Sequence, residues 1–576
     1  MDAQRLLRFE SFELDVRSRE LRKGKQRIRL QEQPFEILRL MLERPGDVVT
    51  REELARHLWP KGTFVDFEHS LNAAVKRLRA ALGDDADNPR FVETLPRRGY
   101  RFIASLRDGE TVAMLLVMAD FNARLAVLPF ANLSGDPGQE YFSDGLTEEM
   151  IQQLGRLCRG RIAIISRSSS TVFKGSRRRA REIGDVLRAD YLLEGSVRRE
   201  ADRVRITAQL VETQSEAHLW TDAYERSLTD CLSVQAEVAA RIARSLAVEL
   251  LPEQPVQPSH NAAAYQTYLK GRYYWNIPGD QGFPQAVEYF TQACESDPSF
   301  AAAHADLARA HTAQAEYYNL VPRKALETAR PIADRALELD PHLAQAHRAV
   351  ANIRAMLDWD WEGAEAGFRQ SIALNPSSDG AHRWYGLLLA GIGRSPEAVR
   401  EAQRAHELDP LCLVTGTGAA WTQYMAGDYQ PAIDTCRLVM EMQRLFTPAW
   451  RVLGVSLIQM GRIAEGVSEL EAAAAIAPTD PVLLAWLAHA KATCGECSVA
   501  RTIIAALDGL RQERFVPAYH LSLAHVGLGE ADEAFRQLDL ACEERDPALI
   551  NLNRDPRFDP IREDARFAVL LDRVRL

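Results

Sequence analysis

The feature that most constrains the fold is a proline that recurs along the second half of the chain. Six prolines share this phase, and the first four, each preceded by Asp or Asn, are separated by 43, 35 and 34 residues: Pro298, Pro341, Pro376, Pro410, Pro478 and Pro547. Proline cannot continue an α-helix, because it lacks the backbone N–H and clashes with the preceding turn. A period near 34 therefore predicts repeated helix pairs. We expect about eight pairs between residues 263 and 576, with an insertion around Ile277–Gly282.

Small and large apolar residues recur inside the same period. The best copy combines a large residue, a leucine, two small residues and the closing proline: Trp450, Leu453, Gly454, Ala473 and Pro478. This pattern resembles the tetratricopeptide family. The resemblance implies an all-α superhelix whose concave groove binds a protein or peptide partner. We interpret the aromatic residues Trp384, Trp421 and Trp486 as core residues of the superhelix rather than a ligand cage.

The charge of the chain is unevenly distributed. Residues 1–107 hold 22 Lys and Arg against 17 Asp and Glu, a net charge of +5, whereas the remaining residues hold 48 against 63, a net charge of −15. A basic segment at one end of an acidic chain is typical of polyanion binding by that end. We therefore expect the amino-terminal segment to contact nucleic acid and the acidic remainder to have another task.

Two neighbouring elements carry this basic character. Apolar residues at steps of four, three and four predict a helix over residues 69–83 with one buried stripe: Leu71, Val75, Leu78 and Leu82. The outward side of the same helix carries Asn72, Lys76 and Arg79, with Arg77 beside them. A solvated helix face can also hold several basic residues. The basic sequence LPRRGYRF that follows at 95–102, with Gly99 for a tight turn, predicts a hairpin and favours nucleic-acid binding over that alternative.

The first hundred residues resemble the OmpR/PhoB-type winged-helix family. A sheet over 8–30, a helix over 34–44, a helix opened by Thr50, the 69–83 helix and the hairpin follow in the family's order, over residues 7–105. The resemblance implies a winged helix-turn-helix domain that binds double-stranded DNA. It places one set of side chains in or near the major groove and a second set at the wing: Asn72, Ala73, Lys76, Arg77 and Arg79, then Arg97, Arg98 and Arg101. Since no receiver domain precedes it, we expect control from the carboxyl-terminal side.

The middle of the chain alternates strands and helices. Strands are expected at 124–130 and 161–167, helices through Leu146 and Ile183, a hairpin of two strands around Ala201-Asp202, and a closing helix at about 230–250. The phrases AVLPFANLSGDPGQEYFSDGLTEEM and YLLEGSVRREADRVRITAQLVE resemble the TolB-like amino-terminal domain. The resemblance covers residues 124–250 and implies an α/β domain with a mixed sheet.

We find no catalytic or cofactor-binding pattern in the sequence. Asp144, Glu148 and Glu149 form an acidic cluster, which we interpret as capping and solvated residues of a first helical turn. The segment Ser134–Gly138 lacks the lysine of a phosphate loop and is interpreted as a turn. We therefore predict a protein that is not an enzyme and that holds no metal or cofactor.

The cysteines and the apolar segments bear on the compartment. Eight scattered cysteines without framework spacing suit a reducing cytoplasm. The apolar run TVAMLLVMA at 111–119 is too short to span a bilayer. We expect a soluble, cytoplasmic protein without a membrane span.

These features predict a multidomain chain. Its parts are a winged-helix domain at 1–107, a linker at 108–123, a TolB-like domain at 124–250, a proline-rich linker at 251–262 and tetratricopeptide repeats at 263–576. The predicted function is that of a sequence-specific one-component transcriptional regulator, binding as a homodimer or in tandem for useful affinity. The alternative is a tetratricopeptide scaffold protein whose basic amino-terminal segment serves only as a weak tether to DNA.

Overall fold

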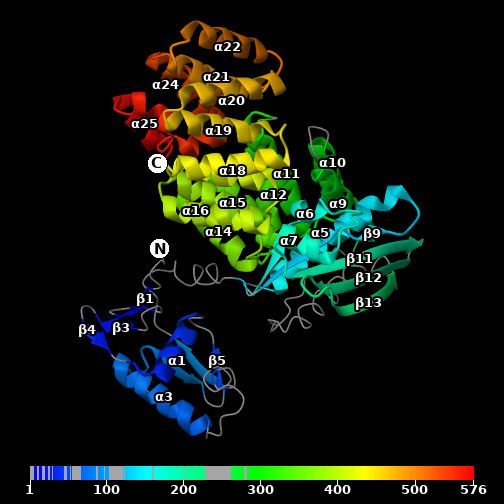
Figure 1. The fold of residues 1–576 in the computed structure, drawn as a ribbon. Helices are drawn as coiled ribbons and strands as arrows, with labels where there is room; N and C mark the ends of the chain where they lie inside the picture. Colours follow the sequence, from blue (N-terminus) through cyan, green and yellow to red (C-terminus); the bar gives the residue numbers. More distant parts are fainter. Residues whose placement is uncertain are drawn as a thin grey trace. The chain divides into compact units, whose positions relative to one another are not determined.

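The computed structural model of the chain divides into two compact units, Met1–Ala119 and Asp120–Leu576, which are described separately (Figure 1). The structure describes residues 6–9, 12–15, 20–23, 26–28, 30–43, 48–51, 54, 67–85, 89–95, 98–102, 121, 123–158, 161–200, 203–227, 261–277, 282–318 and 320–576. Several predicted features lie outside these residues. They are Arg97, most of the helix opened by Thr50, most of both linkers and the helix at 230–250.

The first unit combines two antiparallel sheets with helices. Strands β1 to β4 form a meander in chain order: Leu6–Phe9, Phe12–Asp15, Glu20–Lys23 and Gln26–Ile28. The second sheet has the order β5-β7-β6, with these bounds: β5 Val48–Thr50, β6 Val92–Leu95 and β7 Gly99–Phe102. Helix α1 spans Glu32–Glu43 and α3 spans Phe67–Leu82. Sheet, helices and carboxyl-terminal hairpin follow in the predicted order.

The core of the first unit confirms the predicted apolar stripe. All four stripe residues of α3 are buried: Leu71, Val75, Leu78 and Leu82. They share one cluster with aromatic side chains of the sheets, in which Phe91 meets Phe12 edge-on at 5.4 Å between ring centroids. Gly99 is needed for a reason other than the predicted turn. A Cβ at this position would overlap the backbone of Val49 on the neighbouring strand, so only glycine lets β5 and β7 approach.

The second unit begins with a mixed sheet of strand order β10-β8-β11-β12-β13, and β9 pairs with β11. The strand bounds are β8 Ala123–Val127, β9 Ala131–Asn132, β10 Ile162–Ile165, β11 Tyr191–Glu200, β12 Arg203–Glu212 and β13 His218–Ser227. Strand β8 runs parallel to β10 and β11, and the last three strands run antiparallel to one another. The mixed sheet is as predicted, but β13 extends the predicted hairpin to three strands.

Helices cover both faces of this sheet. Helix α5, Glu140–Leu157, packs on one face through Leu146 and Leu154. Helix α7, Ala180–Leu187, packs on the other face through Ile183 and Leu187, next to the short helix α6, Arg167–Thr171. Because the sheet is buried on both sides, its parallel strands read as continuous apolar runs.

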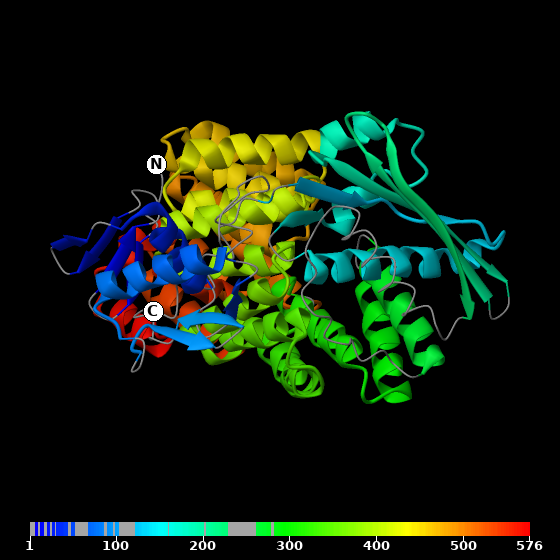
Figure 2. The same cartoon turned by 90° about the horizontal axis from the view of Figure 1, so that it is seen from below.

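Over the described residues from 261 onward, the second unit forms an array of eight helix pairs, as the proline period predicts (Figures 1 and 2). The pairs are α9 Ala262–Trp275 with α10 Gly282–Ser296, α11 Ala301–Glu316 with α12 Pro322–Leu339, α13 Ala344–Ile353 with α14 Trp361–Leu374, α15 Asp379–Gly391 with α16 Ser395–Leu408, α17 Leu413–Met425 with α18 Tyr429–Met442, α19 Thr447–Gln459 with α20 Ile463–Ile476, α21 Pro481–Thr493 with α22 Cys497–Leu510, and α23 Ala518–Gly527 with α24 Ala531–Glu544. The 3-10 helices η4, Pro547–Asn551, and η5, Pro556–Ile561, lead to α25, Ala565–Arg573.

The recurring residue types act as predicted. Gly454 of α19 faces Leu470 and the backbone of Gly466 on α20, so that a side chain there would separate the two helices. A second glycine stands at the turn inside each of five successive pairs, 34 residues apart, with φ between 72° and 91°: Gly393, Gly427, Gly461, Gly495 and Gly529. This left-handed conformation favours glycine at the end of a helix.

The helical array curls until its last turn meets its early helices. The hydroxyl of Tyr318, which follows α11, donates a 2.8 Å hydrogen bond to the carboxylate of Asp546. The indole of Trp361 on α14 donates to the backbone oxygen of Arg575 at 2.9 Å. These contacts join positions more than two hundred residues apart, so the superhelix encloses its concave side.

The α/β domain packs directly on this array. Leu269 of α9 lies against Gly145 of α5, where a Cβ would overlap the leucine side chain. One apolar cluster contains residues of the sheet, α5, α9 and α10. On the other side, the backbone N–H of Ser166 donates to Leu408 O at 2.8 Å. The two predicted domains therefore form a single compact unit with a shared core.

Candidate DNA interface and cavities of the second unit

Helix α3 presents two basic side chains at the surface of the first unit. Lys76 is exposed, and none of the residues described by the structure makes a hydrogen bond or ion pair with it. Arg77 is also exposed and donates a 2.8 Å hydrogen bond to the side-chain oxygen of Gln31, just before α1. A surface hydrogen bond of this kind contributes little to stability and can be exchanged for a phosphate or base contact. Both cations are therefore available to a polyanion.

Two other predicted contact residues of α3 hold the hairpin. Arg79 is half-buried, and its guanidinium donates to the backbone oxygen of Val92 at 2.7 Å and to Thr94 Oγ1 at 2.8 Å, both on β6. The amide oxygen of Asn72 accepts from the hydroxyl of Tyr100 on β7 at 2.7 Å, and from Arg51 at 3.1 Å. Asn72 and Arg79 stand at the two ends of the outward stripe expected from the sequence, and both therefore contact the hairpin.

The wing hairpin itself offers one exposed cation among the described residues. Arg98 is exposed at the turn, where its backbone N–H donates to Leu95 O at 3.0 Å. Arg101 on β7 instead pairs across the hairpin with Glu93 of β6, at 2.6 Å. Ala73 is half-buried on α3, and Arg97 lies outside the described residues. Among the described candidate residues, the positive charges least engaged in contacts within the protein are those of Lys76, Arg77 and Arg98.

The acidic cluster of α5 is not a solvated first turn. Helix α5 already begins at Glu140, after the 3-10 helix η1 at Pro137–Gln139, so Glu148 and Glu149 lie in its third turn. Both carboxylates bind the buried guanidinium of Arg272 on α9, Glu149 at 3.1 Å. Burial would raise the pKa of Glu148, but Arg272 and Arg167 lower it to about 2. The cluster is an internal ion network that joins the α/β domain to the helical array.

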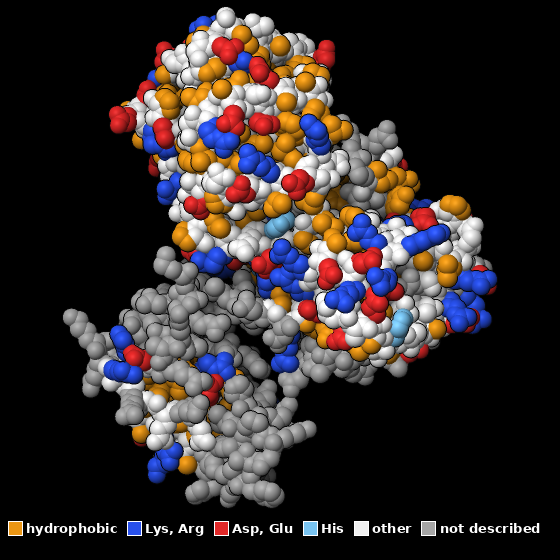
Figure 3. Space-filling model, viewed as in Figure 1, with side chains coloured by type: hydrophobic (Ala, Val, Ile, Leu, Met, Phe, Trp, Pro, Cys, Tyr) orange, Lys and Arg blue, Asp and Glu red, His pale blue; other side chains and the backbone are white. Residues whose placement is uncertain are grey.

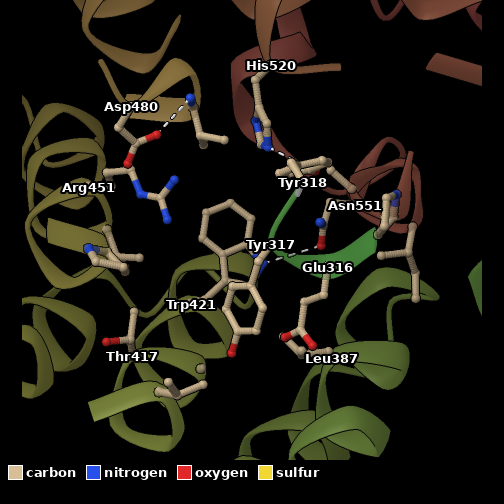
Figure 4. A pocket seen from close by; sticks show the side chains of 18 of the residues that line it. Glu316, Tyr317, Tyr318, Leu387, Thr417, Trp421, Arg451, Asp480, His520 and Asn551 are labelled. Carbon is tan, nitrogen blue, oxygen red and sulfur yellow. Dashed lines mark hydrogen bonds between the residues drawn. The ribbon is translucent and has the colours of Figure 1, made fainter. Parts of the chain in front are cut away.

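An aromatic cavity of about 730 Å³ lies inside the curled array (Figure 4). Figure 4 shows Trp421 and Tyr317 facing into it, with Arg451 and Asp480 on one side and Asn551 and His520 on the other. Trp421 stacks on Tyr424 at 5.0 Å and meets Trp486 at 5.5 Å. The prediction that the tryptophans serve only as core was incomplete. Trp384, Trp421 and Trp486 pack against neighbouring aromatic or cationic side chains and also line this cavity.

A second, polar cavity of about 290 Å³ lies where the α/β domain meets the array. Its walls carry five arginines: Arg167, Arg272, Arg309, Arg348 and Arg383. For two of these arginines the sequence contains an indication that the spacing of the prolines does not show. Arg348 and Arg383 are 35 residues apart, and Arg451 of the aromatic cavity follows 68 residues later. Equivalent positions of successive repeats share one face, so arginines at the repeat spacing gather on the concave side.

Figure 3 shows acidic and basic side chains interspersed on the visible face of the second unit. None of the helices in the described ranges is long and apolar enough to cross a lipid bilayer. Within the same ranges, His, Cys, Asp and Glu side chains form no group of three or more suited to a metal ion.

Comparisons with known protein families match two segments of the chain. The family described as "Transcriptional regulatory protein, C terminal" matches residues 24–102. The family described as "HilA/YgeH-like transcriptional regulator, second domain" matches residues 121–241. The first segment contains α3 and the wing, and the second contains the mixed sheet.

Individual relatives match different lengths of the chain. "Putative adenylate cyclase 3" of Rhizobium meliloti is 35% identical over 232 residues, 39% of each chain, so the match spans well under half of that relative. "Transcriptional regulator HilA" of Salmonella typhimurium is 23% identical over 429 residues, 74% of each chain. Among solved structures, the DNA-binding domain of Klebsiella pneumoniae RstA in complex with the RstA box is 27% identical, with a TM-score of 0.16, over 17% of this chain and 96% of that one.

Proposed function

We propose that this chain is a DNA-binding transcriptional regulator with an OmpR/PhoB-type winged helix, in which α3 and the wing read DNA while the second unit receives the controlling signal. The observation that carries the proposal is the pair of exposed cations on α3, Lys76 and Arg77. We propose domain limits of 1–107 for the winged helix, 124–250 for the α/β domain and 263–576 for the repeats, with linkers at 108–123 and 251–262.

The candidate residues divide into two roles under this proposal. Lys76, Arg77 and Arg98, with Arg97 beside it, contact DNA directly, and Ala73 lies where α3 enters the major groove. Arg can bind guanine through two hydrogen bonds, whereas Lys acts as a point charge on phosphate. Three further side chains orient the wing relative to α3 through the contacts described above: Asn72, Arg79 and Arg101.

The experiment measures the affinity of the full chain for its own promoter region by fluorescence anisotropy. We expect Arg77→Ala to weaken binding by roughly 1–3 kcal/mol and Lys76→Ala to weaken it less and equally for all sequences. Arg27→Ala is the matched control, because Arg27 on β4 is exposed and pairs, within the described part of the chain, with Glu20 at 2.9 Å. Equal losses for Arg77→Ala and Arg27→Ala would assign the binding to net charge and favour the weakly tethered scaffold.

One winged helix makes few contacts, so we propose that the regulator binds as a homodimer or at tandem sites. A two-site footprint, with half-sites separated by about one helical turn, is the expected result. A footprint of one half-site at saturation would contradict it.

We propose that the aromatic cavity anchors a protein or peptide partner. Arg451 lies over the Trp486 ring at 5.6 Å, and no described acidic residue forms an ion pair with it. A cation beside apolar rings suits a peptide with an aromatic side chain next to a carboxylate. Acetyl-Asp-Phe-amide should therefore bind at least about fivefold more tightly than acetyl-Asn-Phe-amide, a difference of about 1 kcal/mol. Arg451→Gln should abolish that preference, and equal binding of both peptides to the wild type would contradict the proposal.

We propose that the chain acts by binding and not by catalysis. The relative named as a cyclase matches over only 39% of its length, and the buried acids of α5 are held by Arg272 and Arg167. Incubation of the full chain with ATP and magnesium ions should yield no cyclic AMP above the blank.

We also propose a cytoplasmic location beside the DNA. Cell fractionation tests it, and a protein that stays with membranes after a high-salt wash would contradict it.

A further inference from the structure

The polar cavity between the α/β domain and the helical array has the features of a built binding site. Its walls come from α5 and α6 on one side and from α9, α11, α13, α15 and α17 on the other. A volume of about 290 Å³ is at the small end of the range for ligand pockets. Any ligand bound there would touch both parts of the unit.

Two of its arginines are held in place by aromatic rings. The guanidinium of Arg309 lies 4.1 Å from the ring centre of Trp275, and that of Arg383 lies 4.8 Å from Trp384. Each also has an acidic partner, Asp306 at 3.2 Å and Glu316 at 3.0 Å respectively. Stacking restricts the guanidinium planes, so these two cations are pre-positioned at the cavity wall.

Arg348 differs from its neighbours. Among the residues that the structure describes, none makes a hydrogen bond or an ion pair with this guanidinium, although it lines the cavity. It passes directly over Gly380 of α15, where a Cβ would overlap Nη1. Burial, followed by repulsion from Arg309, lowers the pKa of Arg348 to about 10. Arg348 is half-buried and its guanidinium faces the confined cavity. A cation held there without a partner is costly, and a bound anion would reduce that cost.

Two hydrogen-bond acceptors of the same cavity are also unused. Asn352 lies one helical turn after Arg348, is only 5% exposed, and its side-chain oxygen has no hydrogen-bond partner. The side-chain oxygen of Gln345 is likewise buried without a partner, while its nitrogen donates to Gln152 at 2.7 Å. Unsatisfied buried polar atoms are rare in folded proteins. Here they adjoin the unpaired cation, so one ligand with an anionic group and hydrogen-bond donors would satisfy all three.

The acids of the cavity do not prevent anion binding. Glu148, Asp306 and Glu316 are each paired with an arginine. Asp409 accepts hydrogen bonds from Ser168 and Ser169, and burial, with Asp379 nearby, raises its pKa to about 7. The remaining acid, Asp379, lines the cavity without forming an ion pair with Arg348. The positive charge of Arg348 is therefore the one that the described side chains leave least compensated.

From this arrangement we infer that the junction cavity binds a small organic anion, a phosphate or carboxylate that also carries hydroxyl or amino groups. Arg348 binds the anionic group, and Asn352 and Gln345 accept hydrogen bonds from the hydroxyl or amino groups. The enclosed volume excludes a nucleic-acid strand. Because the ligand touches both parts of the second unit, its binding stabilises their docking. It also gives the regulator a chemical input separate from the peptide anchored in the aromatic cavity.

The test uses the full chain and three anions: inorganic phosphate, glucose 6-phosphate and gluconate, with glucose as the uncharged control. Thermal unfolding of the second unit should shift upward by several degrees with at least one anion at about 10 mM and not with glucose. A response to glucose 6-phosphate alone identifies a phosphate ligand with hydroxyl groups, and a response to gluconate alone identifies a carboxylate. No shift with any of the three anions would overturn the inference.

Variants separate a binding role from a structural one. Arg348→Gln should weaken the responding anion at least tenfold in calorimetric titration, and Gly380→Ala should do the same by displacing the guanidinium. Arg335→Gln is the matched control, since Arg335 is exposed on α12 and pairs with Glu338. Without ligand, Arg348→Gln should melt at the wild-type temperature or above, because no described side chain pairs with Arg348. A lower melting temperature without ligand, or unchanged anion affinity, would show that Arg348 is a structural residue. This readout is independent of DNA binding, so it can fail while the regulator function holds.

Discussion

The hydroxyl of Tyr100 on β7 donates a 2.7 Å hydrogen bond to the side-chain oxygen of Asn72 on α3. Arg51 strengthens this contact, because its guanidinium lies 5.2 Å from the Tyr100 ring centre and also donates to Asn72. The helix that carries Lys76 and the hairpin that carries Arg98 are therefore joined by side chains as well as by the common core. The spacing of the two basic elements depends on this link.

Tyr100→Phe tests this link. The substitution removes one hydrogen bond between partly buried groups, so we expect a loss of about 1 kcal/mol in the unfolding free energy of the first unit. DNA affinity should also fall, by more than the lower stability of the first unit accounts for, because Asn72 no longer holds β7 next to α3. Urea unfolding and anisotropy measure the two quantities. Unchanged DNA affinity would show that the hairpin position does not depend on Tyr100.

Arg79 and Lys76 should behave differently although both are cations of α3. Arg79→Ala removes two hydrogen bonds to β6 and leaves buried acceptors, so the first unit should lose about 1–3 kcal/mol of stability. Lys76→Ala should leave stability within about 0.5 kcal/mol and lower DNA affinity. Equal effects of the two substitutions on stability would contradict the separation into positioning and contact residues.

Gly99→Ala tests the close approach of β5 and β7. Because the added Cβ would overlap the backbone of Val49, the two strands must separate. We expect a loss of about 1–3 kcal/mol or more in the stability of the first unit, with the wing displaced. A matched change is Gly83→Ala, where nothing lies within 4 Å of the new Cβ but φ is 66°, so only backbone strain is added. Hydrogen exchange of the β7 amides distinguishes the two, since only Gly99→Ala should increase it.

The ion network of α5 predicts how the second unit responds to acid. Glu148 has a pKa of about 2 in the folded chain and an ordinary value of 4.5, so its charge stabilises the fold above about pH 4.5. This contribution, of order 3 kcal/mol, is lost as the pH falls towards 2. The pKa of Glu149 is raised by burial, which acts in the opposite direction. Comparison with Glu148→Gln therefore isolates the contribution of the Glu148 charge to stability. The variant should be less stable than the wild type at pH 7 and should lose less stability between pH 4.5 and 2. Parallel pH profiles would contradict it.

The sequence predicted the elements that depend on local periodicity. The buried stripe of α3, the order of strands and helices in the first unit and the eight helix pairs follow from apolar spacing and from prolines that end helices. The sequence could not show that Arg79 turns inward, since its acceptors, Val92 and Thr94, lie on a strand whose packing is not a local property.

Two further errors have the same origin. The sequence interpretation places Glu148 and Glu149 in a first helical turn, whereas α5 begins two turns earlier, at Glu140. Their partner, Arg272, lies more than one hundred residues away, so no local pattern pairs them. The junction of the α/β domain with the array, and the cavity within it, likewise arises from long-range packing. Arginines at the repeat spacing, Arg348 and Arg383, were the one available signal.

The measurement that tests the central claim most directly is the specificity of the full chain for DNA at fixed salt concentration. Anisotropy competition gives the ratio of affinities for its own promoter fragment and for a shuffled fragment of equal composition. We predict a wild-type ratio of at least about 1,000, within the range of specific regulators. Arg77→Ala should lower this ratio by roughly five- to a hundredfold, and Arg27→Ala should leave it unchanged. A wild-type ratio near one, or a ratio that Arg77→Ala does not alter, would contradict the account of α3 as the element that reads DNA.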